Sequence, residues 1–280
     1  MIQSSNTIQN KETLNFTKEI TMSEIKRDDF DKELTYFNSL IKEYGGVDSY
    51  TTEQAATLFE QIIKMISKLG LNVECRSDFL EGVRQIFNIQ FINMGDYKQG
   101  KYLLVPNHVS EYDGFLFGML IPNMLVVAKS DWVENPRLNA FIEKLFSIVS
   151  IIRKDKVSGI NAIKKCVEHL NKAQDGAVTI FVQQTIADID ITTPEDIASG
   201  AYFIAKKTSA QIIPVYCEQV STEGPTRIVF GSPLVCEDKD DFGNAWLKSE
   251  LALRDSISDP SARPPILCEK HKKPISQRGF

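Results

Sequence analysis

Short apolar runs that alternate with helical stretches constrain the fold of this chain more than any other feature. Seven runs have the length and composition of strands, at residues 89–92, 102–105, 125–128, 148–152, 178–182, 212–216 and 227–230. Between several of them, residues 136–145, 159–172 and 196–208 carry apolar side chains at helical spacing. Strands that alternate with helices in this way build a sheet covered by helices. The sequence therefore predicts an α/β domain.

Helical spacing also governs the chain before the first strand. Apolar residues recur with this period from Phe30 to a stop at Gly45, a capping box begins a second helix at Thr51, and a third helix is expected over 78–86. A last helix is expected over 242–257, followed by a tail rich in proline. The expected organisation is a mobile lead-in at 1–28, a helical portion at 30–87, the α/β domain at 88–257 and a basic, proline-containing tail at 258–280.

Composition excludes several classes of function. The chain has 32 Lys and Arg against 37 Asp and Glu, a net charge of −5, so it has no overall basic surface to hold a nucleic acid backbone. Its five cysteines are scattered, which favours free thiols in a reducing compartment over a zinc ribbon or a disulfide framework. No apolar run approaches the roughly 18 to 20 residues that cross a bilayer. We therefore expect a cytoplasmic protein with no metal site and no nucleic acid partner.

One histidine stands where α/β folds place their active sites. His108 follows the predicted strand 102–105, and Asp113 comes five residues later, at the start of a predicted helix. The carboxylate of Asp113 can orient the imidazole and stabilise its protonated form, which would make His108 a general base without a protein nucleophile. The alternative is a surface histidine beside a helix-capping aspartate, which is a common pair. His169 is expected on a helix, and His271 is expected to be solvated in the tail.

The segment Asn107-His108, followed by four residues and then Asp113, resembles the signature of the glycerolipid acyltransferase family, whose members acylate glycerol 3-phosphate and lysophosphatidic acid. Further segments are similar to the later blocks of this family and occur in the same order. Ala128-Lys129 with residues 146–153 is similar to the second block, which ends in an arginine, here Arg153. Residues 179–181 and 212–215 are similar to the approach to the third block and to the fourth block.

The third block departs from the family pattern. Where the family has Phe-Pro-Glu-Gly-Thr-Arg, this chain has the sequence from Phe181 to Ile186, Phe-Val-Gln-Gln-Thr-Ile. Gln183 keeps the shape of the glutamate and can still bond a hydroxyl group, whereas Gln184 adds volume in place of a glycine. Ile186 removes a guanidinium that would bind phosphate with two hydrogen bonds. These changes weaken the expectation of a glycerol-phosphate acceptor.

The resemblance implies an acyltransferase with a mixed central sheet flanked by helices. His108 and Asp113 would be catalytic, and Asn107, Lys129, Arg153, Gln183 and Thr185 would bind substrate. The reaction would move a fatty acyl group from acyl-CoA or acyl carrier protein, with no other cofactor, to a lysophospholipid or related glycerolipid. Contact with the membrane surface would then run through the N-terminal helices or residues 138–146. The alternatives are an acceptor that is a soluble or carrier-bound secondary-metabolite alcohol or amine, and a non-catalytic acyl-binding relative.

Overall fold

The computed structural model describes residues 24–45, 50–95, 97, 99–218, 222, 225–257, 271 and 273–277. Its helices are α1 (Glu24–Glu43), α2 (Thr52–Lys68), α3 (Arg76–Ile86), α4 (Asp113–Leu120), α5 (Ser130–Glu134), α6 (Pro136–Leu145), α7 (Lys156–Lys172), α8 (Gly200–Thr208) and α9 (Phe242–Ile257). Its strands are β1 (Ile89–Ile92), β2 (Lys101–Pro106), β3 (Met124–Lys129), β4 (Ser147–Ile151), β5 (Gly176–Thr179), β6 (Gln211–Cys217) and β7 (Thr226–Phe230). Within these residues, no helix is long and apolar enough to cross a membrane.

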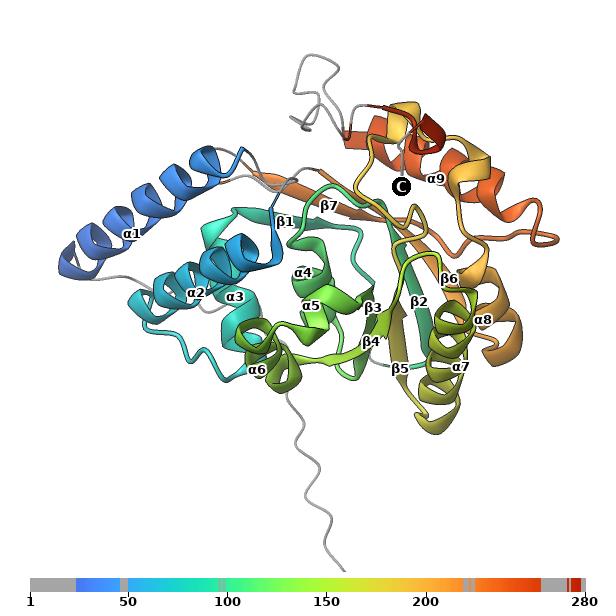
Figure 1. Ribbon diagram of the computed structural model, residues 1–280, viewed down its shortest axis with the longest axis horizontal. Coiled ribbons are helices and arrows are strands. Elements are labelled where there is room, and N and C mark those ends of the chain that lie inside the picture. The colour runs from blue at the N-terminus through green and yellow to red at the C-terminus, as the bar shows by residue number, and fades with distance from the viewer. Residues whose placement is uncertain are drawn as a thin grey trace, which may run out of the picture.

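A single mixed sheet organises the described part of the chain (Figure 1). Its strand order is β1-β7-β6-β2-β5-β3-β4, and only the β6–β7 pair is antiparallel. Strands β2 to β6 therefore all run in the same direction, with β2 in the middle. The predicted α/β fold with a mixed sheet flanked by helices is confirmed. Because the carboxyl ends of parallel strands share one edge, the loops after β2, β3, β4 and β5 meet there.

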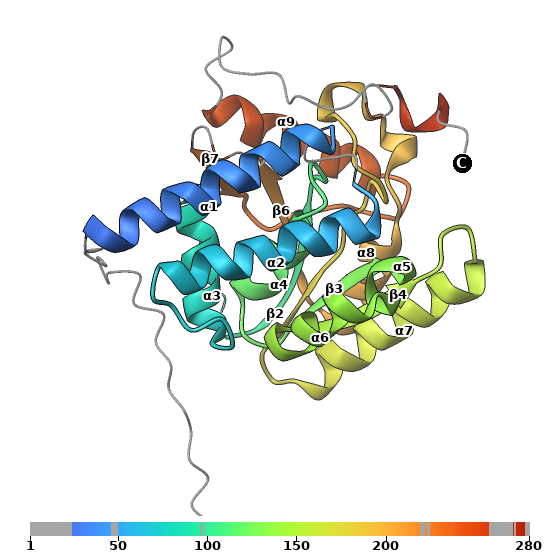
Figure 2. The same ribbon diagram turned by 60° about the vertical axis from the view of Figure 1, so that its left-hand side comes forward.

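Each face of the sheet packs against its own group of helices (Figures 1 and 2). Side chains of β2 alternate between two cores, since Leu104 belongs to the core under α2, α3, α4 and α6, whereas Leu103 and Val105 belong to the core under α7, α8 and α9. Helix α4 is buried on almost all sides, which explains its continuous apolar sequence.

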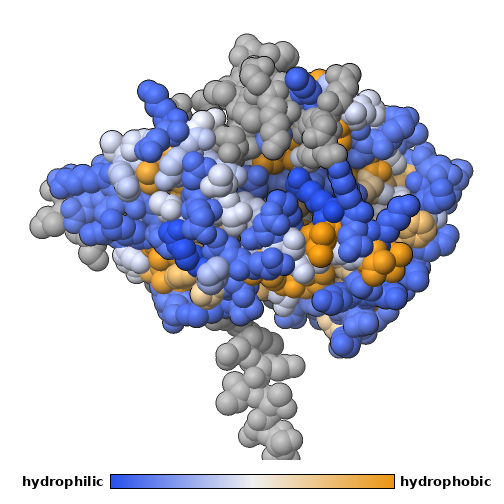
Figure 3. Space-filling view, in the orientation of Figure 1, coloured by the Kyte–Doolittle hydropathy of each residue, from blue (hydrophilic) through white to orange (hydrophobic). Residues whose placement is uncertain are grey.

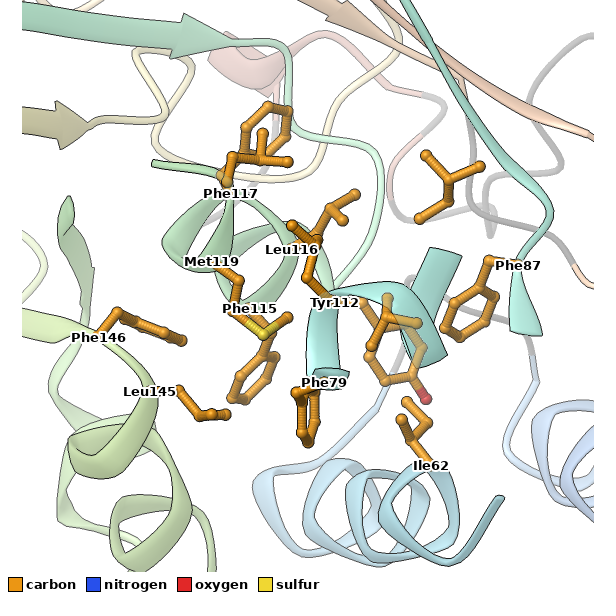
Figure 4. Packing of buried hydrophobic residues seen from close by; sticks show 14 of the residues in the cluster. Ile62, Phe79, Phe87, Tyr112, Phe115, Leu116, Phe117, Met119, Leu145 and Phe146 are labelled. Carbon is orange, nitrogen blue, oxygen red and sulfur yellow. The ribbon is translucent and has the colours of Figure 1, made fainter. Parts of the chain in front are cut away.

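Aromatic side chains fill the core around α4 (Figure 4). Phe115 stacks on Phe59 of α2 with ring centroids 4.5 Å apart, and Phe59 also contacts Phe79 of α3 at 5.7 Å. This core joins the N-terminal helices to the sheet, because it contains buried residues from α1 through β7. Residues 30–87 therefore do not have a core of their own.

Several elements differ from the sequence predictions in their bounds, and one helix was not predicted. Helix α1 begins at Glu24, inside the predicted lead-in. The sequence did not indicate this start, because the first turn of the helix is polar and shows no apolar period. The strand predicted at 178–182 is shifted to Gly176–Thr179, the helix expected from 196 begins at Gly200 after a 3-10 turn at Pro194–Asp196, and α5 was not predicted. Residues 1–23 and most of the predicted tail at 258–280 lie outside the described residues.

Candidate active site

The loop between β2 and α4 carries the predicted catalytic pair. Strand β2 ends at Pro106, and residues 107–112 turn over the edge of the sheet before α4 begins at Asp113. His108 is thus fixed at the carboxyl end of the central strand. Its side chain is 16% exposed, so the imidazole is largely shielded but still reaches the solvent side of the edge.

Asp113 organises this loop. It is fully buried, and its Oδ2 atom accepts hydrogen bonds from His108 Nδ1 at 3.0 Å, from the Val109 N–H at 2.8 Å and from the Ser110 N–H at 3.0 Å. The Ser110 hydroxyl donates to Oδ1 at 2.7 Å. Four donors thus surround one carboxylate, and the bond from Nδ1 fixes the ring of His108. Since Nδ1 is bonded to Asp113, the other ring nitrogen, Nε2, is the atom left to act as a base.

Phe181 completes the support of the imidazole. Its ring lies over that of His108, with centroids 4.4 Å apart and planes inclined by 30°. Phe181 in turn contacts Phe117 of α4, with centroids 6.0 Å apart. The ring of His108 is therefore held both by a hydrogen bond and by packing. In the sequence, Phe181 stands out only as part of a motif, because a contact between two distant loops leaves no local pattern.

Asn107 and Gln183 hold the backbone around the site. The Asn107 side chain bonds the Cys217 backbone in both directions, accepting from its N–H at 2.7 Å and donating to its carbonyl at 3.0 Å. The Gln183 amide accepts from the His108 N–H at 2.8 Å and donates to the Thr192 hydroxyl at 2.8 Å. Both side chains are 1% exposed. The expected direct contacts of Asn107 and Gln183 with a substrate do not fit this geometry, because their polar atoms already bond the protein.

Thr185 and Ile186 of the third block also face inward. Thr185 is 6% exposed and Ile186 is 3% exposed, and neither lines the cavity beside His108. The neighbouring Ala187 N–H donates to the His108 carbonyl at 3.0 Å. Thr185 therefore offers little surface to an acceptor, and its role in substrate binding stays a prediction. The position that holds arginine in the family is occupied here by a buried aliphatic side chain.

Gln184 adopts a backbone conformation that favours glycine. Its φ angle is +60°, in the left-handed region, and its side chain is exposed and lines the cavity. A residue with a Cβ atom is strained there, which accounts for the glycine of the family pattern at this position.

Replacing Gln184 by glycine is expected to raise the free energy of unfolding by up to about 1 kcal/mol, because the left-handed strain is removed. The same change at Gln85, inside α3, is the matched control and should lower it by about 1 kcal/mol. Urea unfolding of both variants measures the difference. Equal destabilisation by the two changes would contradict the assigned strain.

A large cavity opens at this edge of the sheet, with a volume of about 940 Å³. Figure 3 shows the same face, where hydrophobic surface lies close to strongly hydrophilic side chains. Polar and charged groups at the cavity include His108, Glu111, Lys129, Asp131, Arg153 and Gln184. Apolar groups include Phe115, Trp132, Phe146, Ile151, Ile163 and Phe203. A cavity of this size and mixed lining can hold an acyl chain together with a polar group.

The two predicted cationic residues both line the cavity but differ in their surroundings. Lys129 forms an ion pair with Asp131. Arg153 is exposed, as are Lys154 and Lys156, and none of these three forms a salt bridge within the described part of the chain. Arg153 is therefore the better placed of the two predicted residues to bind an anionic group.

Two ionisable residues near His108 were not predicted to belong to the site. Glu111 lines the cavity, and burial raises the pKa of its carboxyl group, while the charges of His108, Arg153 and His271 partly oppose that rise. His271 is 4% exposed, so the expectation that it is solvated is wrong. His271 is close enough to Glu111 to act on it electrostatically, and no pattern in the sequence around His271 indicates that position. Among the described residues, no group of His, Cys, Asp and Glu could hold a metal ion.

Comparison with known proteins identifies the family. The acyltransferase family model matches residues 83–218, a segment that contains β1 to β6 and the whole His108–Asp113 loop. The matched segment is an acyltransferase domain, in agreement with the resemblance of its motifs to those of glycerolipid acyltransferases. The protein is therefore an acyltransferase enzyme.

A solved structure and the curated proteins give two further results. The 1-acyl-sn-glycerophosphate (LPA) acyltransferase PlsC from Thermotoga maritima matches with a TM-score of 0.48 and 15% sequence identity, over 86% of this chain and 100% of that one. No curated protein matches the chain.

Proposed function

We propose that this protein transfers a fatty acyl group from acyl-CoA or acyl carrier protein to a hydroxyl group of a lysophospholipid or related glycerolipid, with His108 as general base. The observation that carries the proposal is the bond between His108 Nδ1 and the buried Asp113, at the edge of a large, partly apolar cavity. No nucleophilic side chain with a base of its own is needed, because an acceptor hydroxyl activated by His108 can attack the thioester directly.

The step balances without any other reagent. His108 Nε2 removes the proton of the acceptor hydroxyl as its oxygen forms a bond to the thioester carbonyl carbon. The carbon–sulfur bond then breaks, and the thiolate takes the proton from His108. Asp113 stabilises the positive charge that His108 carries between these two events. The apolar part of the cavity would hold the acyl chain, and Arg153 would bind an anionic group of the donor or acceptor.

A membrane contact fits a different surface from the one expected. Leu138, Ile142 and Leu145 of α6 are buried, so these apolar side chains of the segment 138–146 cannot touch a lipid surface. Instead, large hydrophobic side chains are exposed beside the cavity mouth, with Ile152 53%, Val157 66%, Ile160 54% and Phe203 40% exposed. Together with the unpaired cations at 153, 154 and 156, this surface supports a peripheral position on an anionic membrane, on the cytoplasmic side.

The proposed reaction is tested by incubating the purified protein with radiolabelled acyl-CoA or acyl carrier protein and a panel of acceptors. We expect labelled diacyl product with at least one lysoglycerolipid. Transfer only to soluble alcohols or amines would replace the lipid acceptor by that class of acceptor. Thioester binding without transfer to any acceptor would show a non-catalytic acyl-binding protein and contradict the proposal.

A further inference from the structure

Glu111 is a carboxylate at the cavity that the proposed chemistry does not use; of the others there, Asp131 pairs with Lys129 and Asp155 caps α7. Asp113, two residues further on, takes the N–H groups of Val109 and Ser110, the Ser110 hydroxyl and His108 Nδ1. None of the described residues donates a hydrogen bond to the side chain of Glu111, although it is partly buried and lines the cavity. A carboxylate shielded from water without donors gains most from a cationic ligand.

The charges around Glu111 do not compensate the burial of its carboxylate. His108, Arg153, His271 and Asp113 are the ionisable groups that act on its carboxyl group, and burial still raises its pKa above the ordinary value. Arg153 is close enough to act on Glu111 electrostatically, but no hydrogen bond joins them. The carboxylate of Glu111 and the guanidinium of Arg153 thus line the same cavity, and neither forms a salt bridge with the described residues.

A phosphate monoester fits the carboxylate of Glu111 poorly, although the exposed cations Arg153, Lys154 and Lys156 at the cavity can each attract it. Such a group carries nearly two negative charges and is repelled by Glu111. The second guanidinium that the family pattern would supply is replaced by Ile186, which is buried away from the cavity. A headgroup with one negative charge and one ammonium group satisfies both Arg153 and Glu111.

We propose that the acceptor carries a zwitterionic headgroup, with its ammonium bound by Glu111 and its single negative charge bound by Arg153. The inference rests on the proposed function, since it names the acceptor class of the same site. It makes Glu111 a residue that determines specificity rather than one that takes part in the proton transfer.

Three lysolipids with the same acyl chain test the assignment: lysophosphatidylethanolamine, which is zwitterionic, lysophosphatidylglycerol, which has one negative charge, and lysophosphatidate, a monoester. The wild type should use them in that order of kcat/KM. Glu111→Gln keeps the shape of the side chain and should lower kcat/KM for the zwitterion by about 10- to 100-fold, because a charge-assisted hydrogen bond is lost. The same variant should change kcat/KM for lysophosphatidylglycerol by less than about threefold. Glu168→Gln, on the exposed surface of α7, is the matched control and should change none of the three.

Equal losses on all three acceptors would mean that Glu111 has only a structural role, and a wild-type preference for lysophosphatidate would also overturn the inference. Binding provides a readout that needs no turnover. A lysophosphatidylethanolamine analogue without its free hydroxyl should bind the wild type about tenfold or more tighter than Glu111→Gln. If the wild type acylates none of the lysolipids, the proposed function fails, while this binding comparison still decides for or against the ammonium site.

Discussion

Replacing Asp113 by asparagine is expected to lower kcat by about 100-fold or more, with the fold retained. The asparagine oxygen can still accept from His108 and from the N–H groups of Val109 and Ser110, and its amide nitrogen can donate to the Ser110 hydroxyl. What the variant loses is the negative charge that stabilises protonated His108. Steady-state kinetics with saturating donor and acceptor measures the loss.

The matched control for this change is Asp31→Asn, on the exposed surface of α1, which should keep the wild-type rate. Circular dichroism and thermal unfolding establish that the Asp113 variant is folded. A folded Asp113→Asn enzyme with a kcat within about threefold of the wild type would show that the carboxylate only shapes the loop.

Substitution of Glu250 is expected to have the largest effect on the free energy of unfolding. It lies in α9, is fully buried, and neither of its carboxyl oxygens has a hydrogen-bond partner within the described part of the chain. Burial raises the pKa of this carboxyl group well above its ordinary value. A buried group of this kind opposes folding, since the unfolded chain ionises it more easily.

Glu250→Leu is expected to raise the free energy of unfolding by about 1–3 kcal/mol at neutral pH. The sign follows from the raised pKa. Below the pKa of the unfolded chain, Glu250 is protonated in both states and imposes no ionisation cost. As the pH rises above that value, the unfolded state releases the proton first and the wild type loses stability.

The pH dependence separates this explanation from simple repacking. The gain in stability of Glu250→Gln over the wild type should be small near pH 4 and grow toward pH 7, and Glu168→Gln should show no such trend. Urea unfolding of the three proteins at a series of pH values measures it. A difference between Glu250→Gln and the wild type that stays constant with pH would contradict the assigned ionisation.

The fold was largely predictable because its strands and helices have clear and different periods. Leu103 and Leu104 point to opposite faces of a sheet buried on both sides, so β2 appears in the sequence as an unbroken apolar run. Boundaries set by contacts were less predictable. Strand β5 stops at Thr179 because the following turn carries Phe181 to the ring of His108. The apolar run continues past that point and gives no sign of the turn.

The candidate site was predictable only where its parts are local. His108 and Asp113 lie in one loop, and their spacing is enough to suggest the bond between them. The direction of the Gln183 side chain depends on the turn around Gln184 and on the bond to Thr192, and neither can be read from the sequence. The prediction therefore had the Gln183 amide facing the substrate instead of the backbone. Glu111 lies within the motif, but the sequence does not show that the nearby hydrogen-bond donors among the described residues bond Asp113 instead of Glu111.

The central claim is that His108 removes the proton of the acceptor, and a single-turnover acyl transfer assay of His108→Ala tests it most directly. With enzyme in excess over radiolabelled thioester and a lysolipid acceptor present, the rate of product formation should fall by about 100-fold or more relative to the wild type. Thioester binding should be largely retained, because all the other residues that line the cavity are unchanged. Equal rates of transfer by the folded variant and the wild type would contradict the mechanism.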